Sequence, residues 1–309
     1  MLIATHPECG EHRPFPGHPE RPERLRAAIS GADGLGARGM DVHVEESDVL
    51  RAIHSVHGAA FPARLRTACE SAPAVFDSDD NPISEGTYRA ALAAVAASVA
   101  GAQEVSRRGA ERVWVPVRPP GHHARRDRAM GFCFFTNAAI AAEELLARGI
   151  GPVAIVDFDV HHGNGTQEHF WERNDVFYLS VHRYPSYPGT GAGDEIGAGR
   201  GRGFTRNYPL ADGADDGTYC GAVASGLEDA LAAFAPSAWV VSAGFDAHHE
   251  DPLGGMKVTE RGYAAIGEML GHAAGKSPVL AVLEGGYALE ALSRSVRTFL
   301  ACLNGVVPP

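Results

Sequence analysis

The sequence predicts a single α/β domain built on a doubly wound, mostly parallel β-sheet with helices on both faces. Two observations support this prediction. Short apolar runs rich in β-branched residues recur along the 309 residues, and stretches with helical periodicity separate them. This alternation is typical of parallel sheets, because parallel strands need a crossover connection that is usually a helix. No shift in composition marks a linker, so we expect residues 1–309 to form one domain.

The first elements are a short strand at residues 2–4 and a helix that proline residues delay until about Pro22. Helical patterns follow over Val56–Ser71 and Ser84–Arg108, and Ser84 is suited to cap the second helix. The Gly- and Pro-rich stretch 183–206 is expected to be a long functional loop. The other expected elements are strands at 112–117, 153–157, 176–182, 238–243 and 278–283, and helices at 137–148, 216–234, 259–272 and beyond 287.

The composition argues against several classes of protein. The chain carries 27 Lys and Arg against 38 Asp and Glu, a net charge of −11, which disfavours nucleic-acid binding and would suit a cationic substrate. Its five cysteines are scattered without a CxxC pair, as is typical of a reducing compartment. The sequence shows no signal-peptide pattern and no apolar run long enough to span a bilayer. We therefore expect a cytoplasmic protein without a membrane partner, and the oligomeric state stays open.

The most informative stretch is 153–167, where an apolar run leads into polar residues and ends on a Gly-Asn-Gly turn. Because side chains alternate along a strand, Asp157, Asp159 and His161 fall on one face at the strand's end. Two carboxylates so close to each other repel, and a cation between them would relieve the repulsion. The histidine adds a nitrogen ligand for such a cation. The stretch therefore predicts a divalent metal site.

Three more strand ends carry candidate functional side chains. His122 and His123 follow a rigid Arg-Pro-Pro-Gly turn, Asp246 follows the strand at 238–243, and Tyr287 follows two glycines after the strand at 278–283. In an α/β sheet this edge is where ligands bind. Three histidines in the N-terminal segment match no standard ligand spacing and are expected to have a rim or structural role: His6, His12 and His18.

Together these residues favour hydrolysis. Asp159, His161 and Asp246 would leave a position on the metal open for water, as catalytic zinc sites do, and such a water has a pKa near 7. The paired histidines could take its remaining proton, and Tyr287 could donate a hydrogen bond to an oxyanion. The expected chemistry is hydrolysis of an amide.

Four motifs in this order resemble the histone deacetylase and acetylpolyamine amidohydrolase family, and the resemblance extends over nearly the whole chain from Gly17 onwards. The motifs are RPPGHH at 118–123, DFDVHHGNGTQ at 157–167, SAGFD at 242–246 and EGGY at 284–287. The resemblance implies a zinc-dependent deacetylase that acts on an acylated lysine peptide or a small acylated amine.

The resemblance also implies roles for individual residues. Asp159, His161 and Asp246 would be the zinc ligands. His123 would be the general base and acid, His122 would pair with Asp157, and Tyr287 would polarise the scissile carbonyl. The residues implied to line the acyl channel are Gly131, Phe132 and Tyr187, with Leu253 at its rim. A structural potassium ion is implied at Asp157, Asp159, His161, Ser180 and Val181.

Three positions bear on which branch of that family the chain resembles. Asn164 stands where the nuclear members have a second aspartate behind the catalytic histidine, as in class II. Tyr187 replaces a channel phenylalanine, which would suit a smaller acylated amine. Leu253 points the other way, because members specialised for polyamines can carry a glutamate at that rim position.

Two other functions remain possible from the sequence. A binuclear manganese ureohydrolase would share the α/β plan and use a sequence like Asp246-Ala-His248, but Asn164 and the loop after Asp246 do not provide the extra carboxylates that two metals need. A non-catalytic module that binds acyl amines would not need the paired histidines or Tyr287. The choice between zinc and ferrous iron stays open, because two oxygens and one imidazole accept either metal. The acyl length also stays open.

Overall fold

The expected fold class is confirmed by the computed structural model, which describes residues 1–108 and 112–306. Eight strands form one sheet in the order β2-β1-β5-β10-β9-β6-β7-β8, and every pairing within it is parallel. The strands are β1 (Leu2–Ile3), β2 (Arg38–Gly39), β5 (Arg112–Val115), β6 (Val153–Asp157), β7 (Val176–Arg183), β8 (Thr205–Leu210), β9 (Ala238–Ala243) and β10 (Val279–Leu283). A separate antiparallel hairpin pairs β3 (Ala74–Phe76) with β4 (Ser78–Ile83).

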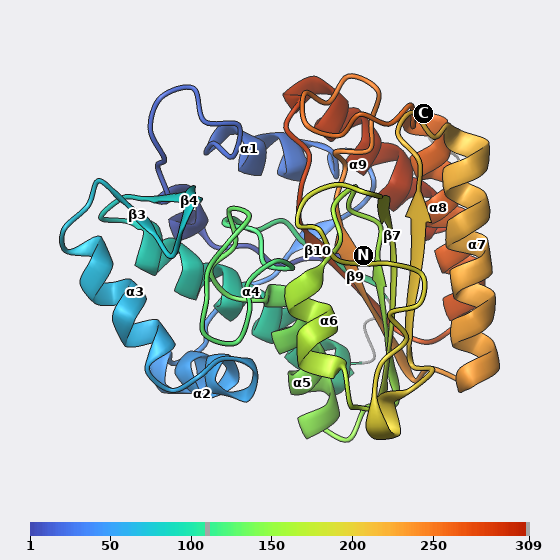
Figure 1. Cartoon of the computed structure of the whole chain (residues 1–309), viewed down its shortest axis with the longest axis horizontal. Coiled ribbons are helices and arrows are strands. Elements are labelled where there is room, and N and C mark those ends of the chain that lie inside the picture. Colours follow the sequence, from blue (N-terminus) through green and yellow to red (C-terminus); the bar gives the residue numbers. More distant parts are fainter. Residues whose placement is uncertain (109–111, 307–309) are drawn as a thin grey trace.

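Helices cover both faces of this sheet (Figure 1). One face packs against α2 (Glu46–Val56), α3 (Phe61–Cys69), α4 (Thr87–Arg108), α5 (Asn137–Ala147) and α6 (Asn164–Phe170). The other packs against α1 (Glu23–Ser30), α7 (Asp216–Ala233), α8 (Glu260–Ala274) and α9 (Leu289–Leu303). The described residues also form two short 3-10 helices, η1 (Pro7–Gly10) and η2 (Gly199–Gly201). The described helices include none that is long and apolar enough to cross a membrane.

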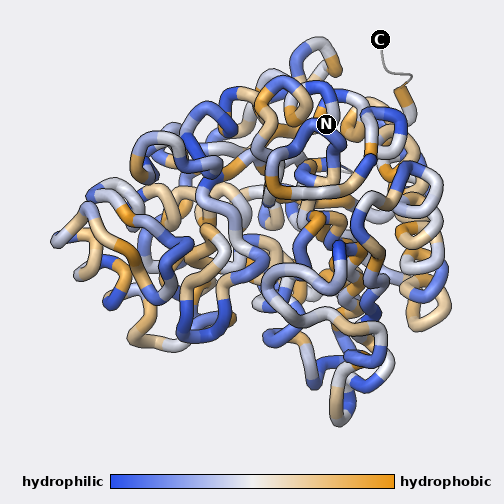
Figure 2. The backbone as a smooth tube through the Cα atoms, turned by 45° about the horizontal axis from the view of Figure 1, so that its top comes forward, coloured by the Kyte–Doolittle hydropathy of each residue, from blue (hydrophilic) through white to orange (hydrophobic). Residues whose placement is uncertain are grey.

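Two hydrophobic cores result from the alternation of side chains along each strand. In β6, Val153 and Ile155 pack with α4 and α5, whereas Ala154 and Val156 face α7, α8 and α9. The central strands are buried on both faces, which explains why they are continuous apolar runs. Figure 2 shows hydrophobic and hydrophilic residues alternating along the covering helices, as expected for helices with one buried side.

Two expected helix boundaries are wrong. The pattern assigned to Val56–Ser71 contains the end of α2 and all of α3, because the chain turns between Val56 and Phe61. The helix expected from Ser84 begins three residues later, at Thr87, whose hydroxyl accepts the Ser84 N–H at 2.8 Å. The Ser84 hydroxyl accepts a hydrogen bond from the backbone N–H of Arg13 at 3.0 Å, so Ser84 joins the N-terminal segment to this helix.

Several described elements were not expected from the sequence. The longest are α2, the hairpin β3–β4, α6 and β8, and the two-residue strand β2 and the 3-10 helices η1 and η2 were not expected either. The β4 sequence is polar and contains a proline, and β8 also contains one at Pro209, so neither shows the apolar alternation of a strand. An edge strand tolerates Pro209, and β8 is the edge of the sheet. The loop expected at 183–206 therefore ends where β8 begins, at Thr205.

A buried ion cluster fastens the N-terminal segment to the sheet. Both oxygens of Glu20 accept hydrogen bonds from the Arg118 guanidinium at 2.6 Å, and Glu20 also accepts one from Arg24 at 3.0 Å. His12 approaches the same carboxylate at 3.4 Å, and all four side chains are buried. Burial opposes the charged form of Glu20, but Arg118, His12 and Arg24 outweigh it and lower its pKa to about 2.

This cluster generates a stability prediction. Glu20→Gln leaves two buried guanidinium groups without their carboxylate, so we expect the free energy of unfolding to fall by about 3–5 kcal/mol. Because the folded pKa of Glu20 lies below its ordinary value of 4.5, this contribution is present above about pH 4.5 and is lost as the pH falls through about 2. Urea unfolding at pH 7 measures the change. The exposed control Glu85→Gln should differ from the original chain by no more than about 0.5 kcal/mol, and an equally small effect of Glu20→Gln would contradict the prediction.

Candidate active site

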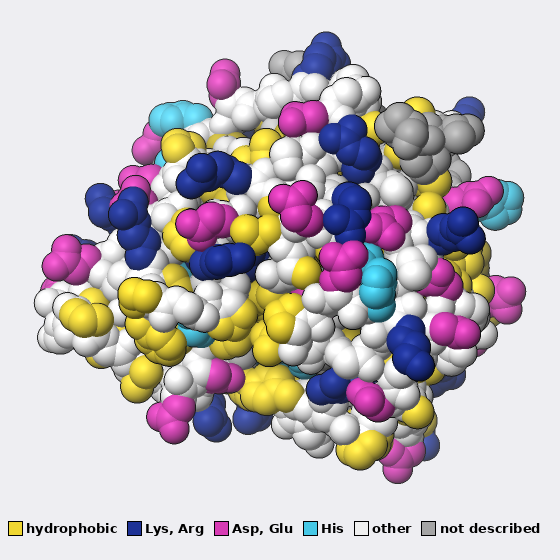
Figure 3. Space-filling view, turned by 90° about the horizontal axis from the view of Figure 1, so that it is seen from above, with side chains coloured by type: hydrophobic (Ala, Val, Ile, Leu, Met, Phe, Trp, Pro, Cys, Tyr) yellow, Lys and Arg dark blue, Asp and Glu magenta, His cyan; other side chains and the backbone are white. Residues whose placement is uncertain are grey.

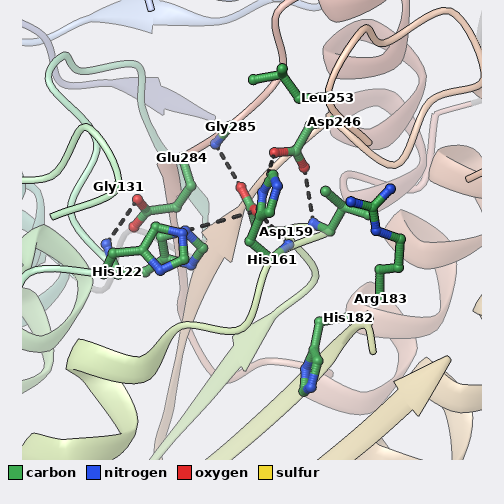
Figure 4. Close-up of polar contacts among 12 residues, drawn as sticks. His122, Gly131, Asp159, His161, His182, Arg183, Asp246, Leu253, Glu284 and Gly285 are labelled. Carbon is green, nitrogen blue, oxygen red and sulfur yellow. Dashed lines mark hydrogen bonds and ion pairs between the residues drawn. The ribbon is translucent and has the colours of Figure 1, made fainter. Parts of the chain in front are cut away.

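The candidate site lies at the carboxyl ends of four strands that are neighbours in the sheet: β5, β10, β9 and β6. Each strand is followed by one group of the side chains singled out from the sequence. These groups are His122 and His123 after β5, Tyr287 after β10, Asp246 after β9, and Asp159 and His161 after β6. The structure thus brings together the residues that the sequence predicted to converge. Figure 4 shows several of them around His161.

Three ligand atoms meet at the centre of this site. Nδ1 of His161 lies 3.1 Å from Oδ1 of Asp159 and 3.2 Å from Oδ2 of Asp246. These separations are close to roughly 3.3 Å, the distance between ligand atoms in a tetrahedron around zinc with bonds of about 2.0 Å. Both carboxylates are buried, and His161 is partly exposed. The three residues therefore fit a single metal ion that remains accessible from one side.

Backbone hydrogen bonds orient both carboxylates. Oδ1 of Asp246 accepts the N–H of Val160 at 2.9 Å, and Oδ2 of Asp159 accepts the N–H of Gly285 at 2.7 Å (Figure 4). The remaining oxygen of each faces His161. A Cβ atom on Gly285 would lie 2.1 Å from Asp246, so this approach requires glycine.

The electrostatics of the three residues favour a cation between the carboxylates. Burial opposes protonation of His161, but hydrogen bonds and charge from Asp159 and Asp246 outweigh it and raise the pKa of His161 to about 10. Burial and the Asp159 carboxylate raise the pKa of Asp246. The two carboxylates repel each other until positive charge lies between them, and a divalent ion provides more of it than a proton does.

The two adjacent histidines have different partners. Nδ1 of His122 donates to Asp157 at 3.1 Å, whereas Nδ1 of His123 donates to Oδ1 of Asn164 at 2.8 Å. Burial opposes charge on His122, but the surrounding carboxylates, Asp157 foremost, raise its pKa to about 10. Burial and the nearby charge of His122 lower the pKa of His123 well below its ordinary value. His123 is therefore neutral at pH 7, with Nε2 as the proton acceptor.

Tyr287 follows β10, the neighbour in the sheet of the strand β5 that precedes the two histidines. Its ring is buried, and the guanidinium of Arg24 lies 4.8 Å from the ring centroid. Arg24 also donates to the backbone carbonyls of Gly286 at 2.6 Å and Glu284 at 2.5 Å. Burial and nearby carboxylates raise the pKa of Tyr287, so its hydroxyl stays protonated and can donate a hydrogen bond.

Two of the predicted channel residues contact the reactive groups directly. The Tyr187 ring packs edge-on against His123 at a centroid distance of 5.1 Å, and the Phe132 ring packs edge-on against Tyr287 at 5.8 Å. Gly131 has φ of +60°, and a Cβ atom there would lie 2.3 Å from the His123 ring. These residues therefore lie beside His123 and Tyr287.

Leu253 is partly exposed and lies near Asp246 (Figure 4). Of the residues expected to hold potassium, Asp159 and His161 belong to the metal-ligand set. Ser180 pairs with Asp157 across β6 and β7. The backbone carbonyl of Val181 accepts a hydrogen bond from the Tyr219 hydroxyl at 2.9 Å, which leaves its second lone pair for another partner. The positions are compatible with a potassium ion.

Sequence reasoning missed two residues that hold this site together. Oδ2 of Asp80 accepts hydrogen bonds from the Tyr187 hydroxyl at 2.8 Å and from the Gly131 N–H at 3.0 Å, so it joins the two loops that carry Tyr187 and Gly131. Glu284 accepts the N–H groups of Gly121 at 2.7 Å and His122 at 3.1 Å. The position of Glu284 directly after a buried strand was the available signal. No comparable pattern surrounds Asp80.

His248, which a ureohydrolase would use as a ligand beside Asp246, has other partners. Its Nδ1 accepts the N–H of Glu250 at 3.1 Å, so the ring proton lies on Nε2, which faces Glu260 at 3.5 Å. The ring stacks on Tyr263. With His249 and Glu250 it forms a group of side chains close enough to hold a metal ion, separate from Asp159, His161 and Asp246. His12 and His18 are buried in packing contacts, as expected of structural residues.

Comparisons with known proteins agree with this site. The histone deacetylase domain family matches residues 18–303. Histone deacetylase 15 of Arabidopsis thaliana is 38% identical over 298 residues, which cover 94% of this chain and 53% of the plant protein. The acetylpolyamine amidohydrolase of Burkholderia pseudomallei is 36% identical over an alignment of 338 residues that covers 97% of each chain.

Solved structures give the same result. The crystal structure of the HDA15 HD domain has a TM-score of 0.90 at 34% identity and covers 100% of this chain and 89% of that one. The crystal structure of acetylpolyamine aminohydrolase from Burkholderia pseudomallei has a TM-score of 0.87 at 32% identity and covers 99% of both chains.

The parallel sheet and the metal-ligand set at its carboxyl edge define a metal-dependent hydrolase of the α/β class. The family match extends over most of the chain and includes every motif of the site. The chain belongs to the histone deacetylase family, and it is a hydrolytic deacetylase.

The contrast between the two histidines generates a prediction about pH dependence. Asn164→Asp places a negative charge beside His123, which favours the imidazolium and raises its pKa. We therefore expect the acidic limb of the kcat/KM pH profile to move to higher pH. Asn174→Asp adds the same charge at an exposed position and should leave the limb in place. A limb that stays put or moves to lower pH in a folded Asn164→Asp variant would show that it does not report His123.

Proposed function

We propose that this enzyme removes acyl groups from lysine side chains or small amines with one zinc ion held by Asp159, His161 and Asp246. The observation that supports this proposal most directly is the meeting of the three ligand atoms at 3.1–3.2 Å beside the neutral His123. A structural ion pair would not need an unprotonated histidine next to it, whereas hydrolysis needs a base there.

In the proposed reaction, His123 accepts the proton of the attacking water at Nε2. A bound zinc ion supplies Lewis-acid chemistry and lowers the pKa of a water molecule to about 7. The water oxygen forms a bond to the acyl carbon while the Tyr287 hydroxyl donates to the carbonyl oxygen. His123 then gives this proton to the leaving nitrogen and the C–N bond breaks, which yields a carboxylic acid and an amine. Transfer of the acid's proton to the amine leaves a carboxylate and an ammonium ion. His122, held protonated by Asp157, supplies positive charge beside this site.

The channel residues favour an acyl-lysine or a monoamine-like amide over an acetylated polyamine. Leu253 has no charge to interact with a second ammonium group of a polyamine. Tyr187 and Phe132 offer ring edges and faces to an aliphatic chain near the reactive groups. Relatives with both kinds of name match the chain, so substrate comparison is the decisive experiment.

We further propose a potassium ion bound by Asp157, Asp159, His161, Ser180 and Val181.

We also propose that residues 1–309 form one catalytic domain and that the enzyme acts in the cytoplasm. The family match over 18–303 supports a single domain. The face in Figure 3 carries basic and acidic side chains intermixed and no continuous basic surface, which supports a function without nucleic acid. Ferrous iron is the alternative to zinc for the same ligands.

The metal proposal predicts one tightly bound divalent ion per chain. Dialysis against a chelator should remove the ion together with the activity, and zinc should restore both, because the proposed attack on the amide depends on the metal. Elemental analysis and activity measured on the same samples test this. Asp246→Asn should lose the ion. Two ions per chain that are both needed for activity would contradict the single site.

Tyr287→Phe tests the proposed oxyanion donor. We expect kcat to fall by about 10²–10³-fold, the range for loss of one such donor, with unchanged metal content. Tyr208→Phe is a matched control, because its hydroxyl bonds to Asp229 at 2.8 Å far from these residues in the fold. A kcat near the original value in Tyr287→Phe would remove this residue from the mechanism.

The substrate proposal is tested by kcat/KM for acetyl-lysine peptides, longer acyl-lysines and acetylated polyamines measured side by side. We expect acyl-lysine to be preferred over acetylspermidine. A tenfold preference for the polyamine, about 1.4 kcal/mol in transition-state binding, would reverse the assignment. Absence of turnover on every amide in the metal-loaded chain would favour a non-catalytic binding module.

A further inference from the structure

The loop that carries Tyr287 depends on contacts from other parts of the chain for its position. It lies between β10 and α9, and it contains two successive glycines, of which Gly286 has φ of +118°. Arg24 holds the carbonyl groups of this loop from one side, as described above. The N–H groups on the other side of the loop need an acceptor, because an unpaired buried N–H is costly.

Asp251 provides that acceptor. Its Oδ2 accepts the N–H of Tyr287 at 2.6 Å and the N–H of Ala288 at 3.3 Å. Its Oδ1 accepts the N–H of Leu253 at 2.9 Å. The Asp251 N–H in turn donates to the carbonyl of His248 at 2.9 Å, and the side chain is only 8% exposed. One buried carboxylate therefore joins the backbone of Tyr287 to the backbone of Leu253.

This arrangement has a consequence for catalysis. Burial and the charge of Asp246 raise the pKa of Asp251 to about 7, and its ionised form accepts N–H hydrogen bonds that are short and about twice as strong as those between neutral groups. The 2.6 Å contact thus limits movement of the Tyr287 backbone, and the buried ring transmits that limit to the hydroxyl. A misplacement of about 1 Å in a catalytic group can cost about 10²-fold in rate.

We infer that Asp251 is a positioning residue for the deacetylation reaction, which holds the Tyr287 hydroxyl at the scissile carbonyl and fixes it relative to the channel rim at Leu253. The inference rests on the proposed role of Tyr287. It assigns Asp251 no direct contact with substrate. A helix-capping role alone is the alternative, because the N–H groups of Tyr287 and Ala288 lie at the start of α9.

A double-mutant cycle separates these two roles. Asp251→Asn keeps the size of the side chain but replaces one acceptor oxygen by an NH₂ group, and we expect kcat to fall at least about tenfold. KM and metal content should change less than about twofold. In the Tyr287→Phe background the same substitution should change kcat by less than about threefold, because the group that it positions is already missing.

Asp216→Asn is the matched control. This carboxylate also accepts a backbone N–H, that of Thr259 at 2.7 Å, but at the start of α8. Asp216→Asn should lower the melting temperature without changing kcat. This control measures what the loss of a carboxylate–backbone hydrogen bond at the start of a helix does when no catalytic group depends on it.

The outcomes are distinct. An equal loss of kcat from Asp251→Asn in both backgrounds would reduce Asp251 to a structural residue, and an unchanged kcat would overturn the inference. A Tyr287→Phe variant with full activity would instead overturn the proposed function of Tyr287. If Asp251→Asn does not fold, amide hydrogen exchange of the original chain decides: the Tyr287 and Leu253 amides should be protected as strongly as those of β10, and rapid exchange would overturn the inference.

Discussion

The repulsion between two buried carboxylates, Asp159 and Asp246, is the constraint on which the rest of this site depends. Both are removed from water, and their free oxygens lie within 3.2 Å of the same His161 nitrogen. Such a pair is stable only if positive charge lies between the two oxygens that face His161 and if hydrogen-bond donors pair with the other oxygen of each carboxylate. The backbone N–H groups of Val160 and Gly285 are those donors. A divalent ion would meet the remaining requirement and would supply the Lewis acid that the proposed hydrolysis needs.

The sheet order makes this constraint possible. Four adjacent parallel strands end at one edge, so residues from four distant parts of the sequence meet there. The loops that follow these strands are irregular, and hydrogen bonds from buried ionisable side chains fix their backbones. Glu284 holds the turn before His122, Arg24 holds the loop of Tyr287, and Arg118 with Glu20 fastens the N-terminal segment behind them. The precision of the site therefore comes from these ionic contacts as much as from the hydrophobic cores.

The sequence was sufficient to predict the fold class and the convergence of the main site residues, because apolar strands and the polar residues that follow them are local patterns. It was not sufficient for the contacts that hold the loops. Arg24 and Gly286 are 262 residues apart, and Tyr187 and Asp80 are 107 apart, and no local pattern pairs them. The polar strand β4, which carries Asp80, also lacks the alternation that marks a strand. The different environments of His122 and His123 were predictable only because Asp157 and Asn164 belong to one recognisable motif.

The central claim is that one metal ion lies between Asp159, His161 and Asp246 and serves amide hydrolysis. The most direct measurement is an anomalous difference map from crystals of the zinc-loaded enzyme, with data collected on both sides of the zinc absorption edge. The account predicts a single strong peak bounded by Nδ1 of His161 and one oxygen of each carboxylate. Two peaks about 3.5–4 Å apart, as in two-metal hydrolases, or a peak outside these three residues would contradict it.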